Sequence, residues 1–376
     1  MQIKYKHQRF QTEAARSIAD AFIGQPKSNG LSDHIIDQGK HRDGQQTIKG
    51  EGYTLAGFGN KNVVLTRDAI CENVRAVQIE QGLKPVDSLQ ELQGVGMAFT
   101  IEMETGTGKT YTYIKTMYEL NERYGWTKFV VVVPSIAIRE GVLKSFESMQ
   151  EHFAQEYNGK RMQYFIYNSK QLSKIDAFAS DAGMHVMIIN TQAFNSSFDE
   201  EKSTGSRADK AARIIFDKRD EFGSRKPIDV LSQCHPIMII DEPQSVLGVD
   251  KGNKTRKGLA QFKPLFTLLY SATHRKGDIY NMMFRLDAID AYNQKLVKKI
   301  EVKGIKQIGS TATNGYVYLE EIIISKGNPQ ARISYDVKTA TGTKQTSKVV
   351  GEQFDLYAQS GELNEYKNNF IVERID

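Results

Sequence analysis

The residues best suited to chemistry lie at 103–110, which read Met-Glu-Thr-Gly-Thr-Gly-Lys-Thr. The glycines let the backbone turn tightly and aim its N–H groups at a bound anion. Lys109 is then placed to reach the β- and γ-phosphates of a nucleotide, and the Thr110 hydroxyl to bind Mg²⁺. The full phosphate-loop pattern has a glycine where this chain has Met103, so an ordinary glycine-rich turn is the alternative. The residues predicted to bind ATP here are Thr105, Gly106, Thr107, Gly108, Lys109 and Thr110.

An acidic pair follows the apolar run 237–240, in the sequence Asp-Glu-Pro-Gln at 241–244. In a protein with a phosphate loop, Asp241 is expected to hold Mg²⁺, through water, because this ion keeps most of its hydration shell. Glu242 is expected to orient and deprotonate the attacking water. With Lys109 these residues form the predicted catalytic group. A solvated Asp-Glu turn that closes a strand is the alternative.

Short hydroxyl side chains end a third apolar run, in the sequence Tyr-Ser-Ala-Thr at 270–273. Ser271 and Thr273 can hydrogen-bond the acidic pair and, together with Gln244, couple it to the state of the nucleotide. Capping of a helix by Ser271 or Thr273 is the alternative.

Two further strand ends carry polar residues that suit contact with a nucleic-acid backbone. Pro134, Ser135 and Arg139 follow one apolar run, and Thr191 and Gln192 follow another. Exposed amides and hydroxyls bind phosphates without regard to base sequence. These five residues are the predicted DNA contacts, and helix capping alone is the alternative.

Phe10 and Gln11 begin the first helical pattern and are a candidate adenine site, with a ring to stack on the base and an amide to pair with it. A buried helix start is the alternative. The lysine-rich runs 251–257 and 295–306 are interpreted as solvated faces rather than binding sites. His274 is interpreted as structural.

The elements that must position these residues alternate between strands and helices. Short apolar runs predict strands at 97–103, 129–133, 164–167, 185–189, 237–240 and 266–270. Helical patterns at 111–123 and 136–153 separate strands, which predicts right-handed crossovers and a parallel sheet with helices on both faces. One earlier helix is predicted to begin at Phe10. A second, capped by Thr66, is predicted to run to about Gln81. Ligands of such sheets bind at the carboxyl ends of the strands, where all the motifs above fall.

Two regions depart from this α/β pattern. The polar block 28–62 is predicted to be a long loop or a ragged hairpin insertion. After residue 300, β-rich runs at 315–325, 331–340, 347–351, 353–358 and 370–373 predict a small antiparallel module. We therefore expect a nucleotide-binding domain at 1–300 and a β-rich module at 301–376.

Composition sets further bounds on the chain of 376 residues. Its net charge of +5 permits a polyanionic partner without demanding one. Cys71 and Cys234 show no metal spacing, so we expect a reducing compartment and no zinc site. No apolar run approaches the ~18 residues that span a bilayer, and the amino terminus lacks the apolar core of a signal peptide. A cytoplasmic protein with no membrane partner is expected.

Together and in this order, the motifs resemble the first motor domain of a superfamily 2 helicase. The Asp-Glu-Pro-Gln box narrows the resemblance to the Res subunit of type III restriction enzymes, over roughly 8–283, and Met103 also fits that family. The resemblance implies a RecA-like fold, ATP and Mg²⁺ as cofactors, and movement on double-stranded DNA. It also implies a Mod methyltransferase partner that recognises the site, endonuclease activity and a bacterial cytoplasmic location.

The chain departs from the family after Thr273, because the remaining sequence is shorter than the ~150 residues that a second RecA-like lobe needs. The resemblance then implies an amino-terminal part that binds ATP and Mg²⁺, hydrolyses ATP poorly and does not cleave DNA. Two alternatives remain. One is another superfamily 2 DNA or RNA helicase with an unusual acidic box, and the other is a nucleotide-gated docking scaffold without turnover.

Overall fold

The computed structural model describes residues 5–28, 35–37, 56–194, 213–248, 254–297, 316–324, 327–367 and 370–375. The chain divides into two compact units, Met1–Lys299 and Ile300–Asp376. Within the described ranges, no helix has both the length and the apolar character needed to cross a membrane.

The large unit is organised around an eight-stranded sheet with the order β10-β4-β9-β8-β5-β7-β6, and with β3 beside β4. Its strands are β3 (Glu91–Leu92), β4 (Gly96–Met103), β5 (Lys128–Val133), β6 (Gln163–Ile166), β7 (His185–Asn190), β8 (Ile237–Asp241), β9 (Thr267–Ser271) and β10 (Met282–Leu286). Neighbouring strands in this order are all parallel. The exception in this sheet is β3, which pairs antiparallel with β4. The predicted parallel sheet is confirmed, with strand bounds within about two residues of the predicted ones.

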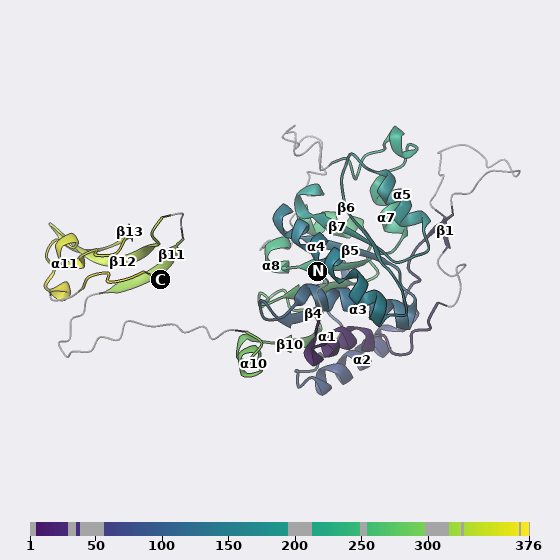
Figure 1. Ribbon diagram of the computed structural model, residues 1–376, viewed down its shortest axis with the longest axis horizontal. Helices are drawn as coiled ribbons and strands as arrows, with labels where there is room; N and C mark the ends of the chain where they lie inside the picture. Colours follow the sequence, from purple (N-terminus) through teal and green to yellow (C-terminus); the bar gives the residue numbers. More distant parts are fainter. Residues whose placement is uncertain are drawn as a thin grey trace, which may run out of the picture. The chain divides into compact units, whose positions relative to one another are not determined.

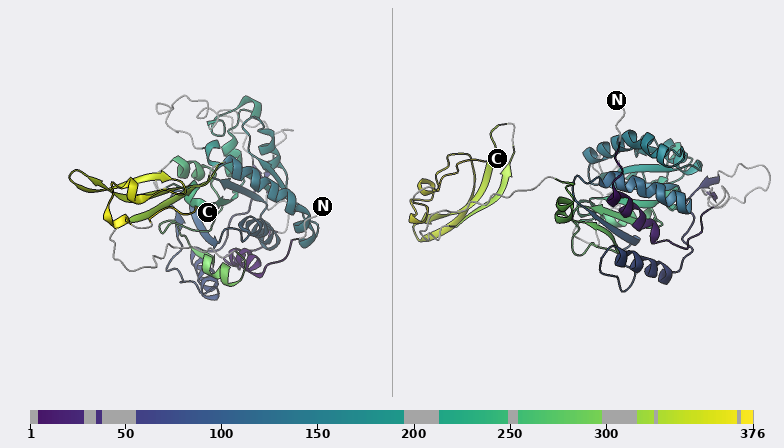
Figure 2. Two further views of the ribbon diagram at one scale, coloured as in Figure 1. Left: turned by 60° about the vertical axis from the view of Figure 1, so that its left-hand side comes forward. Right: turned by 60° about the horizontal axis from the view of Figure 1, so that its bottom comes forward.

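Helices cover both faces of this sheet, as Figures 1 and 2 show. One face packs on α1 (Arg9–Asp20), α2 (Arg67–Glu80), α3 (Lys109–Tyr124), α4 (Ile136–Glu156) and α10 (Ala288–Asn293), and the other on α5 (Ser173–Ser180), α7 (Pro227–Gln233), α8 (Pro243–Val246) and α9 (Lys254–Gln261). In β5, Val131 belongs to the first core and Val130 and Val132 to the second. Because side chains alternate along a strand, burial on both faces requires the continuous apolar runs seen in the sequence.

The predicted helix starts at Thr66 and Ser135 are confirmed. The Thr66 hydroxyl accepts a hydrogen bond from the Ala69 N–H at 3.2 Å, and Ser135 accepts one from Ile138 at 3.3 Å. These bonds satisfy backbone donors that have no partner inside the first turn. They fix where α2 and α4 begin.

Strand β10 was not predicted, because it is short and Arg285 interrupts its apolar pattern. Arg285 forms an ion pair with Glu102 of β4 at 2.9 Å, and the Asn281 amide donates to the Ala98 carbonyl oxygen at 2.7 Å. Both residues extend the pairing with β4 through side chains. A pattern based on apolar residues alone cannot register such contacts.

The polar block 28–62 is partly a hairpin-like pairing, since β1 (Ile35–Asp37) and β2 (Ala56–Phe58) pair antiparallel. Residues 29–34 and 38–55 of the predicted insertion lie outside the described residues. Asn60 at its end is buried, and its side chain bonds the backbone of Thr127 and Lys128 at 2.7–2.9 Å. The end of the block is therefore fixed to the start of β5.

The small unit contains an antiparallel sheet, as predicted. Its strands are β11 (Val317–Ile323), β12 (Gln330–Thr339) and β13 (Gly342–Val350). Strand β13 begins five residues earlier than predicted, directly after a tight turn from Thr339 to Gly342. The predicted strand at 353–358 is wrong. Asp355 accepts hydrogen bonds from the next turn and starts the short helix α11 (Leu356–Gln359).

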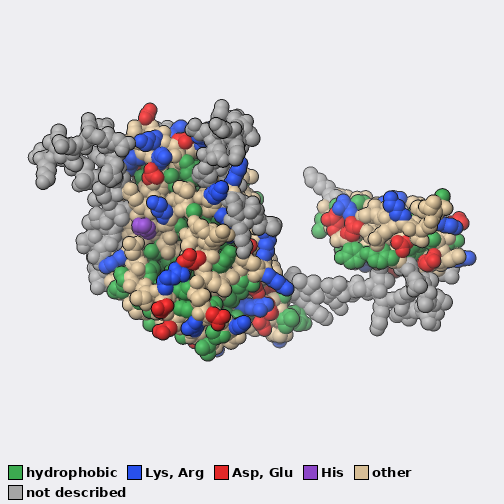
Figure 3. Space-filling model, turned by 180° about the vertical axis from the view of Figure 1, so that it is seen from behind, with side chains coloured by type: hydrophobic (Ala, Val, Ile, Leu, Met, Phe, Trp, Pro, Cys, Tyr) green, Lys and Arg blue, Asp and Glu red, His purple; other side chains and the backbone are tan. Residues whose placement is uncertain are grey.

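The predicted run 370–373 contributes an isolated bridge between Asp355 and Ile371 rather than a strand. Figure 3 shows a band of hydrophobic side chains on the small unit. The large apolar residues exposed in this unit come mainly from β11 and its ends, including Tyr316, Tyr318, Leu319, Ile322 and Ile324.

Candidate nucleotide site and neighbouring polar face

The glycine-rich turn closes tightly between β4 and α3. Gly106 and Gly108 have φ of +81° and +91°, which residues with a Cβ rarely adopt. Thr107 donates both its N–H and its hydroxyl to the Glu104 carbonyl oxygen, at 3.2 and 2.6 Å. The strand, turn and helix around these residues have the form that a phosphate loop requires.

Lys109 is the first residue of α3 and extends across the end of the sheet. Its ammonium lies 3.4 Å from the Met103 carbonyl oxygen and 3.3 Å from Glu242 Oε1. Strand β9 lies between β4 and β8, so the loops that follow β4 and β8 meet above the end of β9. The structure therefore brings Lys109 and the acidic pair together.

Asp241 is the last residue of β8 and is buried. Burial, and then the charge of Glu242, raise the pKa of its carboxyl from 3.8 to about 6. This carboxylate offers hard oxygen ligands, and because it is buried its negative charge is poorly solvated. Thr110 follows Lys109 in α3 and offers a hydroxyl. Both are ligand types that Mg²⁺ prefers.

Glu242 follows Asp241 in the left-handed conformation, with φ of +52° and ψ of +62°. Such a conformation is strained for a residue with a Cβ and is found most often at functional sites. Burial acts to raise the pKa of its carboxyl, but hydrogen bonds from Gln244 and Ser271 and the charge of Lys109 outweigh it and lower the pKa. Glu242 is therefore a carboxylate at neutral pH.

Ser271 stands at the centre of a small hydrogen-bond network. Its Oγ lies 2.8 Å from Glu242 Oε2, 2.9 Å from Gln244 Oε1 and 2.9 Å from the Thr273 carbonyl oxygen. A hydroxyl has one proton, so it donates to one of these acceptors at a time. The alternative that Ser271 or Thr273 caps a helix is wrong, because the next element along the chain is β10.

Gln11 reaches the phosphate loop from α1, since its Nε2 donates to the Thr107 carbonyl oxygen at 2.9 Å. A Cβ added to Gly108 would lie 2.4 Å from this Nε2, so the contact requires glycine. Phe10 is buried in the core that α1 forms with the sheet. For Phe10 this agrees with the alternative of a buried helix start. Gln11, by contrast, lies at the phosphate loop.

Tyr113 belongs to the same site and was missed. It is fully buried on α3, and its pKa is raised well above the usual value by burial and then by the charge of Asp241. In the sequence it was counted only among the apolar positions of a helix. Tyr113 lies four residues after Lys109, so both side chains are on one side of α3. This spacing is the sequence feature that could have identified Tyr113.

The five predicted DNA contacts come together at the ends of the neighbouring strands β5 and β7. Thr191 Oγ1 donates to the Pro134 carbonyl oxygen at 3.4 Å, and Arg139 donates to Asn190 Oδ1 at 3.3 Å. Ser135 caps α4 beside them. Gln192 Oε1 accepts from the Asn190 amide at 3.5 Å. This polar face borders β8 but is separated from β4 by β8 and β9.

The described parts of the lysine-rich runs do not join the site. Lys254 and Lys257 are exposed, as predicted, but Arg256 between them is buried and forms an ion pair with Asp278 at 2.9 Å. Residues 251–253 and 298–306 lie outside the described residues. His274 Nε2 lies 3.1 Å from the Ile101 carbonyl oxygen, consistent with a structural role.

A cavity of about 640 Å³ lies elsewhere, beside Gly94 and Gln261. Gly94 precedes β4, so this cavity is at the opposite end of β4 from the phosphate loop.

The strand order, the phosphate loop and the acidic box define a RecA-like α/β unit of the helicase type. The family of the type III restriction enzyme Res subunit matches residues 72–275, more than half of the chain. This chain belongs to that family.

Curated relatives agree with this assignment. The EcoP15I Res subunit of Escherichia coli is 30% identical over 260 residues, which cover 65% of this chain and 25% of that protein. The EcoPI Res subunit of Escherichia phage P1 is 31% identical over 257 residues, which cover 64% and 25%. The StyLTI Res subunit of Salmonella typhimurium is 30% identical over 268 residues, which cover 62% and 26%. The chain spans about a quarter of the length of these relatives.

Two solved structures are more distant. The SWI2/SNF2 ATPase core of Sulfolobus solfataricus in complex with double-stranded DNA matches with a TM-score of 0.30 and 12% identity, over 47% of this chain and 27% of that chain. The KaiC-like protein PH0186 of Pyrococcus horikoshii matches with a TM-score of 0.20 and 12% identity, over 70% and 85%. With scores this low, the fold class rests on the strand order itself.

Proposed function

We propose that this chain is an ATP-binding motor unit of a type III Res subunit, which acts on double-stranded DNA together with a Mod methyltransferase partner. The observation that carries the proposal is the Lys109–Glu242 contact of 3.3 Å at the carboxyl edge of the sheet. It joins the two halves of an NTPase site from segments far apart in the sequence. Membership in the Res family supports the type of motor.

ATP is the substrate that fits this site best. The loop from Thr105 to Gly108 presents N–H groups at the start of α3, where the helix dipole favours an anion. Lys109 then exchanges its contact with Glu242 for the β- and γ-phosphates. This exchange frees a Glu242 oxygen for water, so nucleotide binding and activation of the base are coupled.

Mg²⁺ fits the oxygen ligands that Thr110 and Asp241 supply. When bound, it neutralises charge on the β- and γ-phosphates. A nearby cation also relieves the unfavourable burial of the Asp241 carboxylate. Glu242 stays deprotonated at neutral pH and accepts the proton of the attacking water. Gln244 and Ser271 hold its other oxygen and fix the orientation of the carboxylate.

The polar face after β5 and β7 is the proposed DNA-binding surface. Ser135, Thr191 and Gln192 offer hydroxyl and amide groups for phosphate contacts, which are independent of base sequence. Arg139 bonds Asn190 and Glu140 in the structure and would exchange these partners for a phosphate. Since β5 lies beside β8, a shift of the acidic box on nucleotide binding reaches this face through one strand.

We further propose that the chain alone hydrolyses ATP slowly and does not cleave DNA. The phosphate loop contributes one cation, Lys109, whereas rapid turnover in such motors uses an added arginine worth about 10³–10⁵ in rate. The described site also presents no paired set of acidic and lysine residues on adjacent strands beyond the groups named above. Rapid ATP hydrolysis stimulated by DNA in the isolated chain would contradict this part of the proposal.

Titration of a non-hydrolysable fluorescent ATP analogue with Mg²⁺ tests nucleotide binding. Lys109→Ala is expected to weaken binding by about 10–100-fold, because it removes a charged hydrogen-bond donor worth about 1.5–3 kcal/mol. Lys144→Ala, an exposed lysine on α4, is the matched control and should bind normally. Equal affinity of wild type and Lys109→Ala would overturn the proposal.

Glu242→Gln separates a motor from a docking scaffold. In a motor this variant keeps nucleotide binding and loses the residual ATP hydrolysis, because the base is removed and the site geometry remains. A scaffold without turnover would bind Mg²⁺ and the nucleotide but show no hydrolysis above background even in the wild type, and Glu242→Gln would change nothing.

A further inference from the structure

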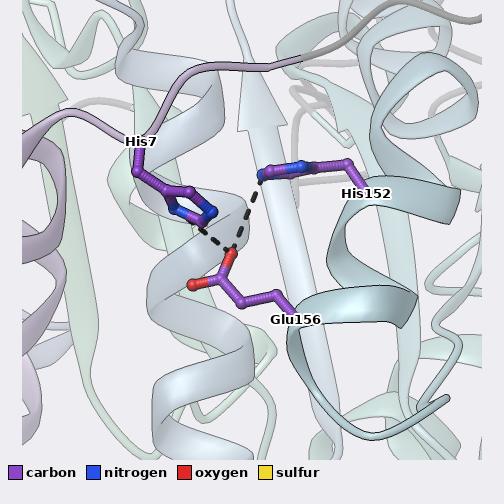
Figure 4. A group of neighbouring side chains, drawn as sticks. All are labelled: His7, His152 and Glu156. Atoms are coloured by element: carbon purple, nitrogen blue, oxygen red, sulfur yellow. Dashed lines mark ion pairs between the residues drawn. The ribbon is translucent and has the colours of Figure 1, made fainter.

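A second group of chemically capable side chains lies outside the proposed nucleotide and DNA sites. His7 precedes α1, while His152 and Glu156 lie one turn apart on the last part of α4 (Figure 4). Their nearest ligand atoms all lie within 4.8 Å of one another. Glu156 Oε2 is 4.0 Å from His7 Nδ1 and 3.7 Å from His152 Nε2. In Figure 4 both imidazoles face this one carboxylate oxygen.

Glu156 Oε2 is buried and has no hydrogen-bond partner among the described residues. Both imidazole nitrogens are too distant to donate to it. The other carboxylate oxygen, Oε1, accepts from the buried ammonium of Lys115. A buried acceptor without a donor calls for an explanation, such as a water molecule or an ion that completes the site. The direction of the two imidazoles indicates that this partner is shared by all three side chains.

Although the cysteine spacing predicted no zinc site, we propose that His7, His152 and Glu156 bind a divalent transition-metal ion, with Zn²⁺ as the best match. Two imidazole nitrogens and one carboxylate oxygen are ligands that Zn²⁺ takes, with one position left for water. Ligand atoms bound at ~2.0–2.2 Å lie about 3–3.5 Å apart, so the observed separations need only a small closure. His7 provides it easily, because its side chain is 63% exposed and lies in a segment before the helix.

The groups around the cluster set the strength of the site. Lys115 neutralises part of the Glu156 charge, so we expect weaker binding than in a closed structural zinc site. The Tyr111 hydroxyl lies 2.9 Å from His152 Nε2, the atom that the metal would take. Metal binding therefore displaces the bond to Tyr111, which lies two residues after Lys109 on α3.

The bound ion would join the segment before α1 to α4. Gln11, one turn after His7, is the residue that contacts the phosphate loop. The metal thus acts on the same two elements, α1 and α3, that form one side of the proposed nucleotide site. The metal site itself does not depend on that proposed function, since none of its ligands belongs to the phosphate loop or the acidic box.

Calorimetric titration of Zn²⁺ into the full 376-residue chain, without a histidine tag and after treatment with a chelator, tests the proposal. The wild type is expected to bind one ion saturably. His7→Gln is expected to weaken binding by about 100-fold, the upper end of the loss seen when a supporting residue is removed. Because His7 is exposed, this variant should fold normally. Glu147→Gln, an exposed glutamate on the same helix, is the charge-matched control and His235→Gln the imidazole control.

Co²⁺ provides a second measurement that does not depend on heat. Its visible absorption should increase on binding to the wild type and to both controls, and should be lost in His7→Gln and His152→Gln. Two results would overturn the proposal. One is the absence of saturable Zn²⁺ binding by the folded wild type, which would leave water as the missing partner. The other is equal affinity of wild type and His7→Gln.

Discussion

Helix α3 carries two lysines that each face a carboxylate, and the two pairs differ in what they leave unsatisfied. Lys109 lies 3.3 Å from Glu242, whose second oxygen accepts from Gln244 and Ser271 at 2.6 and 2.8 Å. Lys115 bonds one oxygen of Glu156 and the Tyr157 hydroxyl, and the second oxygen of Glu156 has no described hydrogen-bond donor.

The difference separates exchangeable pairs from structural ones. Glu242 keeps two neutral donors when Lys109 leaves, so the ion pair can open for a nucleotide at little cost. The Lys115 side chain is only 3% exposed, and its departure would leave a mostly buried carboxylate with no compensating charge. We therefore propose that Lys109 serves nucleotide binding, whereas Lys115, further along the same helix, serves folding.

The largest effect is expected for Lys115→Met compared with Lys109→Met. Lys115→Met should lower the free energy of unfolding by about 3–5 kcal/mol, because it breaks a buried pair and leaves Glu156 uncompensated. Lys109→Met should cost no more than about 1 kcal/mol, because Glu242 is 27% exposed and retains its hydrogen bonds. Urea denaturation of both variants measures the difference. Similar losses in the two variants would remove the distinction between the pairs.

Asp241 is expected to give the Glu242 pair a pH dependence. Below pH 4 the Asp241 carboxyl is protonated in both the folded and the unfolded chain. Its folded pKa of about 6 exceeds the ordinary 3.8, so its contribution to stability is lost as the pH rises through 6. Asp241→Asn should therefore raise the free energy of unfolding at pH 7.5 by on the order of 3 kcal/mol in the absence of Mg²⁺.

The check on this prediction is denaturation of wild type and variant from pH 4 to 8. The two curves should nearly meet at pH 4, diverge as the pH rises to about 6, and run parallel above it. Asp87→Asn, an exposed aspartate, should follow the wild type throughout. A variant that is less stable than the wild type at pH 7.5 would contradict the assigned direction of the pKa shift.

The sequence was sufficient for the parts of the site that are local. Residues 103–110 and 241–244 each form a strand end and a turn, so their spacing predicts their geometry. The same holds for the caps at Thr66 and Ser135, which depend on bonds to residues three positions away.

The remaining parts depend on contacts between distant segments. Gln11 and Thr107 meet only because α1 packs on α3, and the charge of Asp241 raises the pKa of Tyr113 only because β9 brings β4 and β8 together. Strand β10 was missed because it is short and because Arg285, which pairs with Glu102, interrupts its apolar run. The cluster of His7, His152 and Glu156 likewise depends on where the segment with His7 lies, which no spacing encodes.

A smaller effect is expected at Gly108, which directly precedes Lys109 of the exchangeable pair. Gly108→Ala places a Cβ 2.4 Å from Gln11 Nε2 and forces a residue with a side chain to adopt φ of +91°. The strain is about 1–2 kcal/mol. We expect the loop to relax away from the conformation that aims its N–H groups at the phosphates, so affinity for the ATP analogue should fall about tenfold. Gly141→Ala is the control, because a Cβ there meets no atom within 4 Å and its φ is not positive. Adding Gln11→Ala should restore part of the loss if the clash contributes.

The smallest effect is expected for Ser271→Ala, which tests whether Glu242 is held by several partners. The variant removes one donor, and the Gln244 amide at 2.6 Å remains on the same oxygen. We expect a loss of about 1 kcal/mol in stability, the usual value of one hydrogen bond, and nearly normal binding of the ATP analogue. Because Ser271 also meets Gln244 and Thr273, its removal should affect residual ATP hydrolysis more than nucleotide affinity. Ser145→Ala, on the exposed side of α4, is the control. If Ser271→Ala instead weakened nucleotide binding as much as Lys109→Ala, Glu242 would depend on a single donor, as Glu156 depends on Lys115.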